Sequence, residues 1–303
     1  MQFPTEFFLL LLASSLHVAS YRNDLLGRSM QICPRLFNCS DVEDIAIEDL
    51  IGEGAVKRVY RGLWFSHYYA VNVLKEPQFS RDFLTGLHVL QLLNASPHVI
   101  KLVGLCRDKR LFLSEFHQFG DARNVHKILE ELASDSIVNR LKFCISYVEI
   151  LEFLHSENNG VRVMCDSNDL PKTLSQFLVT DGLRLVLNDA DALPSVSEAA
   201  DKKIICGHRE ITSSFAAPEQ LWPFPGTTFN LTAMPKYDEK TDIWKVPNVC
   251  EHFLGTYANH KVVKYMLFEI HKLCKSKKPD DRPSATAIKN MYIESLNKIL
   301  LNS

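Results

Sequence analysis

A short glycine-rich segment at residues 52–59 has the composition of a phosphate-binding loop. It reads GEGAVKRV, and Gly52, Gly54 and Val59 fit the pattern G-x-G-x-x-x-x-V between two β-prone runs. Glycines let the backbone fold close over phosphate groups and turn its N–H groups toward them. Two glycines alone also fit an ordinary tight hairpin, so other residues must decide between the two interpretations.

Carboxylate and amide side chains further along could complete a site for phosphoryl transfer. Asp166 follows a long amphipathic pattern and could accept the proton of an attacking hydroxyl; the alternative is a loop carboxylate without chemistry. Asp189 ends a predicted hairpin, where a carboxylate could hold Mg²⁺ between ATP phosphates, and Asp191 is the alternative ligand. Gln176, before the hairpin, offers a second ligand oxygen. These residues predict ATP and Mg²⁺ as cofactors.

The order of these residues is that of a protein kinase, and three further matches support it. Glu219 lies in an A-P-E sequence, Asp242 in a D-x-W sequence, and Arg282 in D-R-P before the last helical pattern. Arg282 is the expected ion partner of Glu219, and Asp242 is expected to brace the catalytic loop. Each match alone has an ordinary explanation, such as a helix cap or a surface charge, but their order and spacing together favour a kinase.

Two departures from the kinase pattern raise an alternative. Ala70 is expected to contact ATP, but Asn72 stands where the third strand of a kinase carries its lysine. An Asn cannot neutralise phosphate charge, whereas Lys57 could reach the same phosphates from the adjacent loop. The catalytic loop reads MCD in place of HRD, and the missing arginine argues against control by activation-loop phosphorylation. If Lys57 is only a solvated surface residue, the chain is an inactive pseudokinase that binds glycan or protein.

The elements that must position these residues follow from hydrophobic periodicity. Strands are predicted at 49–51, 59–64, 68–74, 99–106 and 111–117, a hairpin at 177–179 and 183–187, and helices at 83–93, 138–154, 261–274 and 283–301. Strands therefore dominate the first part of the chain and helices the rest. We predict an α+β, bilobal protein-kinase-like fold over residues 45–303, with a small β-rich N-lobe and a larger helical C-lobe.

The first 44 residues indicate entry into the secretory pathway. Residues 7–19 form a mostly apolar run that ends in small residues, and no Lys or Arg precedes it. The run is shorter than the roughly 20 residues of a comfortable membrane span. Residues 1–20 are therefore predicted to be a signal peptide or a short signal anchor, and residues 21–44 a luminal segment.

Cysteines and sequons agree with a luminal location. Cys33 and Cys39 are a candidate disulfide in an oxidising compartment. Asn38 and Asn230 begin N-x-S/T sequences and are expected glycosylation sites, whereas Asn94 is doubtful because a proline follows its sequon. The net charge of −2 gives no strongly basic field, so nucleic acid is a poor candidate partner.

Several runs resemble the protein O-mannose kinase family, an atypical kinase family of the secretory pathway. They lie at 52–59, 162–176, 206–210, 217–223 and 237–240. The run at 162–176 is the most specific, because ordinary protein kinases do not carry it. The resemblance extends from about Cys33 to the end of the chain.

The resemblance implies an activity and a location. Members of this family are single-pass type II proteins of the endoplasmic reticulum, facing the lumen. They transfer the ATP γ-phosphate to the 6-hydroxyl of mannose in a GalNAc–GlcNAc–Man trisaccharide on α-dystroglycan. By the same resemblance, Asp166 is the general base, Asp189 and Gln176 hold magnesium, and Lys57 contacts phosphate. Residues 167–175 are the expected wall of the sugar site. A secreted protein kinase, which would phosphorylate a peptide hydroxyl, is the third alternative.

Overall fold

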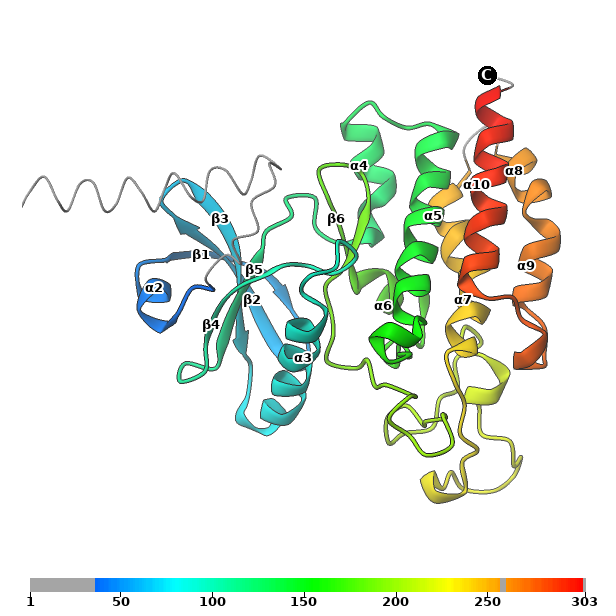
Figure 1. The fold of residues 1–303 in the computed structure, drawn as a ribbon, viewed down its shortest axis with the longest axis horizontal. Coiled ribbons are helices and arrows are strands. Elements are labelled where there is room, and N and C mark those ends of the chain that lie inside the picture. The colour runs from blue at the N-terminus through cyan, green and yellow to red at the C-terminus, as the bar shows by residue number, and fades with distance from the viewer. Residues whose placement is uncertain (1–35, 257–259, 302–303) are drawn as a thin grey trace, which may run out of the picture. The chain divides into compact units, whose positions relative to one another are not determined.

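The computed structural model describes residues 36–256 and 260–301, and in them a sheet lobe is followed by a helical lobe (Figure 1). The expected α+β, bilobal architecture is confirmed. The signal segment expected at 1–20 lies outside the described residues, as does most of the segment expected at 21–44. The described part of the chain contains no helix long and apolar enough to cross a membrane.

The sheet lobe is built on five antiparallel strands in the order β1-β2-β3-β5-β4. Their bounds are β1 Ala46–Glu53, β2 Lys57–Trp64, β3 His67–Leu74, β4 Leu102–Cys106 and β5 Leu111–Glu115. Helix α3, Ser80–Leu93, packs on the sheet through a tilted contact between Phe83 and Phe112, whose ring centroids are 5.5 Å apart. The lobe thus holds β2 and β3, which carry Lys57, Val59 and Ala70, against one helix.

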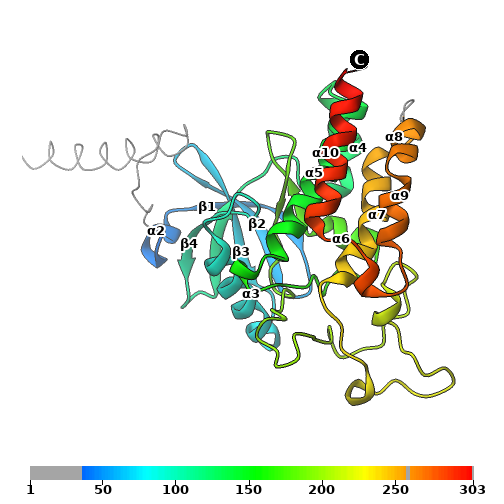
Figure 2. The ribbon, with the colours of Figure 1, turned by 45° about the vertical axis from the view of Figure 1, so that its right-hand side comes forward.

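The helical lobe is built around α5, which is buried along most of its length. Its helices are α4 Val125–Glu131, α5 Ile137–Leu154, α6 Leu170–Ser175, α7 Lys240–Leu254, α8 His260–Met266, α9 Phe268–Cys274 and α10 Ala285–Leu301. Helices α7 and α10 both pack on α5, and a hairpin of β6 Phe177–Val179 and β7 Leu185–Leu187 lies beside it (Figure 2). This hairpin carries the candidate metal residues into the site.

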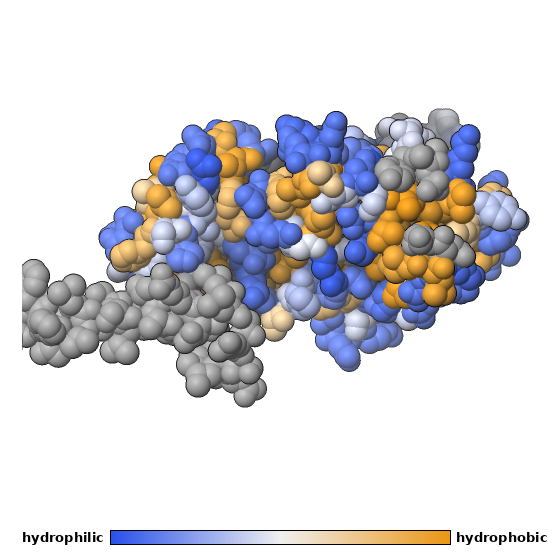
Figure 3. Space-filling model, turned by 90° about the horizontal axis from the view of Figure 1, so that it is seen from above, coloured by the Kyte–Doolittle hydropathy of each residue, from blue (hydrophilic) through white to orange (hydrophobic). Residues whose placement is uncertain are grey.

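One expected helix differs from the structure. The pattern at 261–274 predicts a single helix, but the buried Leu267 separates α8 from α9. Buried Val263 and Ile270 face the core, whereas Val262 and Phe268 are exposed. Figure 3 shows apolar side chains gathered at the end of the helical lobe that carries α8 and α9, at the right of the view. The sequence pattern therefore predicted helical structure over this segment but not the break within it.

The disulfide expected between Cys33 and Cys39 is wrong. Cys39, in the short helix α2 Cys39–Glu43, pairs instead with Cys106 at the end of β4. Phe37 bonds to both sides of Gly104 on β4, which brings the following residues alongside that strand and sets the two Cα atoms 4.6 Å apart. Cys33 lies outside the described residues. Two further disulfides join Cys144 to Cys250 and Cys165 to Cys206.

Candidate active site

Lys57 forms ion pairs with both candidate metal ligands, Asp189 and Asp191, between the two lobes. Its ammonium lies 2.9 Å from Asp189 Oδ1 and 3.6 Å from Asp191 Oδ1. Lys57 begins β2, and the two aspartates follow β7, which is held to the sheet lobe by the bond from Ile100 N to Leu187 O. The structure therefore places Lys57 in the predicted site and not among the solvated surface lysines.

Asn72 does not occupy the role of the missing lysine. It is buried, and its amide donates to Ala70 O and Ser114 Oγ at 3.1 Å each. Val59 is the register partner of Asn72 across β2 and β3. Because alternate residues of a strand share a face, Lys57, Val59, Ala70 and Asn72 line the same side of the sheet. Lys57 is the positively charged residue of that side that reaches Asp189 and Asp191.

The glycines of the phosphate loop leave open space. A Cβ added at Gly52 would lie 3.7 Å from Val59, and one at Gly54 would lie 3.9 Å from Lys57 O, both ordinary contacts. Neither glycine adopts a positive φ. The folded chain itself therefore does not require glycine at either position, whereas a phosphate group approaching the backbone would.

Helix α3 also approaches the site through a glycine. A Cβ at Gly86 would lie 3.0 Å from the Asp191 Cα, so the segment of Asp191 would have to shift by a few tenths of an ångström to admit it. The sequence offered no helix glutamate to pair with the phosphate-binding lysine. In the structure Asp189 and Asp191 are the partners of Lys57, and α3 packs directly on their segment.

Lys172 is a site residue that sequence reasoning missed. Its ammonium lies 2.6 Å from Asp166 Oδ2 and 3.8 Å from Asp189 Oδ2, so it connects the candidate base to the candidate metal ligand. It lies in α6, which occupies the second half of the segment expected as an irregular loop at 167–175. Asp169 caps this helix by accepting a bond from Lys172 N. That capping signal, an Asp followed by Leu-Pro, was readable in the sequence.

Burial and charge set the pKa values of the cluster. Burial opposes the charge of Lys57, but Asp189 and Asp191 outweigh it and raise the Lys57 pKa. Burial also works against ionised Asp189, yet the Lys57 ammonium holds the pKa of Asp189 well below its usual range. Burial raises the pKa of Asp191 to about 7, with Lys57 opposing and Asp189 adding to that rise. The two aspartates thus differ strongly in their affinity for a proton.

The donor set fits a magnesium ion shared with nucleotide phosphates. Asp191 Oδ1 is buried without a hydrogen-bond partner, and the Lys57 ammonium lies 3.6 Å away. The buried Gln176 can offer its side-chain oxygen as a further ligand. The backbone bond from Asn188 N to Gln176 O holds Gln176 beside the aspartates. Among the described residues, no three His, Cys, Asp or Glu side chains are grouped as a metal site. Mg²⁺ is commonly held by one or two carboxylates and substrate phosphates, which matches this arrangement.

The loop that carries Asp166 is anchored at several points. Asp242 Oδ2 accepts a bond from Met164 N at 3.0 Å and lies 3.3 Å from His155 Nε2. Cys165, immediately before Asp166, is joined by its disulfide to Cys206. Asp242 therefore has the bracing position expected from the sequence, and the missing arginine of the loop is replaced by a covalent link.

The remaining structural residues also lie as their motifs indicate. Arg282 makes a bidentate pair with Glu219, at 2.5 Å and 2.7 Å, and its side chain is fully buried.

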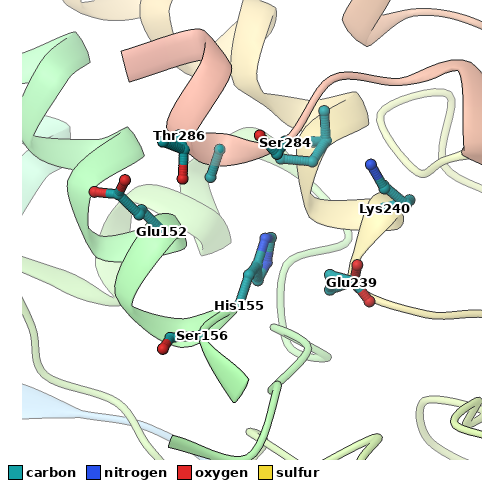
Figure 4. Close-up of a pocket in the computed structure, with 9 residues that line it drawn as sticks. Glu152, His155, Ser156, Glu239, Lys240, Ser284 and Thr286 are labelled. Carbon is teal, nitrogen blue, oxygen red and sulfur yellow. The ribbon is translucent and has the colours of Figure 1, made fainter. Parts of the chain in front are cut away.

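A cavity of about 290 Å³ lies in the helical lobe between α5, α7 and α10. His155 and Lys240 are among the residues that line it (Figure 4). The candidate site is not this cavity but the carboxylate and lysine cluster between the lobes.

The three sequon asparagines differ in exposure. Asn38 and Asn230 are exposed, although each side chain caps a short helix, Asn38 at α2 and Asn230 at residues 231–233. The amide of Asn94 bonds to both Leu102 N and Leu102 O. Asn94 is thus the least available of the three for a glycan.

The sequence of the chain is similar to those of several known kinases. No family model matches the chain. The chain is 40% identical over 276 residues to protein O-mannose kinase of Homo sapiens, covering 89% of this chain and 78% of the human protein. It is 41% identical over 254 residues to the protein of that name from Gallus gallus, covering 82% and 72%. Mitogen-activated protein kinase kinase kinase 7 of Mus musculus is 24% identical over 116 residues, covering 38% and 20%.

Proposed function

Because the chain belongs to the protein O-mannose kinase family and is a glycan kinase, we propose that it transfers the γ-phosphate of ATP to the 6-hydroxyl of an O-linked mannose. The proposed acceptor is the GalNAc–GlcNAc–Man trisaccharide of α-dystroglycan. The observation that carries this proposal is the position of Lys57 between Asp189 and Asp191, with Asp166 and Lys172 alongside. A pseudokinase could keep Lys57 and the two aspartates to bind ATP, but it would not need Asp166 as a base beside them.

Each side chain of the cluster has a role in the proposed transfer. Asp189, Asp191 and Gln176 would hold Mg²⁺, which when bound neutralises charge on the ATP phosphates. Lys57 binds the same phosphates as a point charge. Asp166 accepts the proton of the mannose hydroxyl while the new O–P bond forms and the bond from the γ-phosphorus to ADP breaks. Lys172, between Asp166 and Asp189, stabilises charge on the phosphoryl group in passage.

A location in the lumen of the endoplasmic reticulum is part of the proposal. Three disulfide bonds among the described residues support an oxidising compartment. The exposed Asn38 and Asn230 are consistent with glycosylation there. A type II anchor, or a cleaved signal peptide, at residues 1–20 stays a prediction.

The decisive test is phosphate transfer from ATP with magnesium to a synthetic GalNAc–GlcNAc–Man acceptor. We expect transfer by the unaltered chain and its loss in Asp166→Ala. A Ser/Thr peptide as the alternative acceptor tests the protein-kinase interpretation and is expected to remain unmodified. Folded protein that binds ATP but phosphorylates neither acceptor would establish the pseudokinase alternative.

A further inference from the structure

A fully buried lysine lies directly under the catalytic loop. Lys245 is on α7, and its side chain is 0% exposed. Its ammonium lies 2.5 Å from Ser167 Oγ and 3.5 Å from Asp242 Oδ1. Burial lowers the pKa of Lys245, and the Asp242 carboxylate opposes that shift. A charge at this depth is costly, and an apolar side chain of similar size would often be at least as stable.

The Lys245 ammonium bonds to the catalytic loop through Ser167, and its other polar neighbour is Asp242 on its own helix. Ser167, which follows Asp166, accepts the bond from Lys245 and donates its own hydroxyl to Met164 O. Met164 N in turn donates to Asp242 Oδ2. One hydrogen-bonded circuit therefore runs from α7 to both sides of Asp166. Ser167 is itself buried, so solvent does not compete for these bonds.

The rest of the site does not fix Asp166 in this way. The Asp166 side chain is 45% exposed, and it pairs with Lys172, which is itself 39% exposed. An exposed ion pair of this kind constrains geometry weakly. The direction in which the Asp166 carboxylate points therefore depends on the backbone at 164–167, which the circuit from α7 holds.

We propose that Lys245 is a positioning residue for phosphoryl transfer, acting through Ser167 to orient the Asp166 carboxylate toward the acceptor hydroxyl. The inference rests on the proposed role of Asp166 as the base. A displacement of about 1 Å at a reacting group can cost roughly 100-fold in rate. An apolar residue at position 245 could not make the hydrogen bond to Ser167 that holds the loop in place.

The test compares Ser167→Ala, Lys245→Met and the double variant in steady-state transfer to the trisaccharide. Ser167→Ala removes one oxygen and keeps the fold, so it tests the circuit even if Lys245→Met does not fold. We expect kcat to fall by roughly 10- to 100-fold in each, with the KM for ATP unchanged. The double variant should be no slower than the slower single variant, because both break the same circuit. Ser167→Thr, which keeps the hydroxyl, should recover most of the rate.

Lys275→Met is the matched control. Lys275 is another lysine of this lobe, partly buried, 2.6 Å from Asn248 Oδ1 and over the Trp244 ring, and its contacts lie away from the catalytic loop. We expect it to lower the unfolding temperature without changing kcat. Unchanged kcat in folded Ser167→Ala, while Asp166→Ala is inactive, would overturn the inference and leave the proposed function intact. Full activity of Asp166→Ala would instead show that Asp166 is not the general base. Both the role of Lys245 and the proposed mechanism of transfer would then be wrong.

Discussion

The ammonium of Lys57 lies 2.9 Å from Asp189 Oδ1, although 132 residues separate them in the sequence. One residue belongs to the sheet lobe and the other to the segment after β7, so this ion pair joins the two lobes. Both side chains are mostly buried, at 12% and 22% exposed. The pair holds an ammonium and a carboxylate side by side at the place where ATP phosphates and magnesium are expected.

Replacement of Lys57 by Met should therefore abolish measurable transfer. Loss of one preorganised charge in a phosphoryl-transfer site costs on the order of 10²- to 10³-fold in kcat. Met keeps the length of the side chain, so the change removes charge and little packing. Transfer to the trisaccharide acceptor, measured with magnesium and saturating ATP, checks this expectation.

Lys75→Met serves as the control for Lys57. Lys75 also lies at the phosphate loop, 2.6 Å from Glu53 and 3.4 Å from Gly54 O, but it does not contact the two aspartates. Its loss should change the rate by less than about threefold. If the two variants were equally slow, general disturbance of the loop, and not the Lys57 charge, would explain the loss.

The sequence predicted the parts of the site that depend on local order along the chain. Gly54, Asp166 and Asp189 were recognisable because each lies at a fixed place relative to a strand or helix. Lys57 was recognisable because it lies in the glycine-rich segment next to the strand in which Asn72 replaces the usual lysine. These relations follow from short-range geometry, which periodicity records.

The parts that depend on tertiary packing were not predictable. Lys172 reaches Asp166 because α6 brings it there, and Lys245 reaches Ser167, the residue after Asp166, from a helix far along the chain. Cys39 lay close to Cys33 in sequence, but packing of its segment on β4 gave it Cys106 as a partner. Periodicity says nothing about which of these distant residues meet.

Removal of the disulfide between Cys165 and Cys206 should lower kcat by about tenfold. Cys165 adjoins Asp166, so the double variant Cys165→Ser and Cys206→Ser loosens the backbone beside the base. The disulfide closes a long loop, and its loss should also cost about 2–4 kcal/mol of unfolding free energy. Kinetics of the purified folded variant check the first effect and denaturant unfolding the second.

The disulfide between Cys39 and Cys106 is the comparison for that experiment. It lies in the sheet lobe, between α2 and β4, and touches none of the site residues. Its double Ser variant should lose a similar amount of stability but keep the kcat of the unaltered chain. Equal losses of kcat in both variants would show that stability alone accounts for the effect.

His271 should make the protein less stable in mild acid. Burial lowers its pKa to about 4, and its ring lies 2.6 Å from the Tyr292 hydroxyl. An unfolded His binds a proton near pH 6.5, so between pH 6.5 and 4 the unfolded state binds more protons and stability falls as pH falls. The contribution at pH 5 is on the order of 2 kcal/mol relative to pH 8. Denaturant unfolding of His271→Gln at both pH values should show a smaller difference, whereas exposed His88→Gln should show the difference of the unaltered chain.

The pair of Arg282 and Glu219 should carry stability and not catalysis. Arg282 is fully buried, and its guanidinium also donates to Ser276 O and Lys240 O. Arg282→Met leaves Glu219 and these carbonyls unpaired, which should cost about 3–5 kcal/mol of unfolding free energy. Arg61→Met, in an exposed pair with Glu48, should leave the unfolding free energy nearly unchanged. Similar losses in the two variants would contradict a special contribution of the buried pair.

Lys172→Met should lower kcat with little change in the KM for ATP. The ammonium lies between Asp166 and Asp189, where charge changes during transfer, and not at the phosphate loop. An interaction that strengthens only in the transition state lowers kcat and kcat/KM equally when it is lost, here by roughly 100-fold. Lys172→Arg keeps the charge and should recover part of the rate, and Lys236→Met, in an exposed pair with Asp201, should have no effect. A rise in the KM for ATP at constant kcat would instead identify Lys172 as a residue that binds ATP equally in the ground state and the transition state.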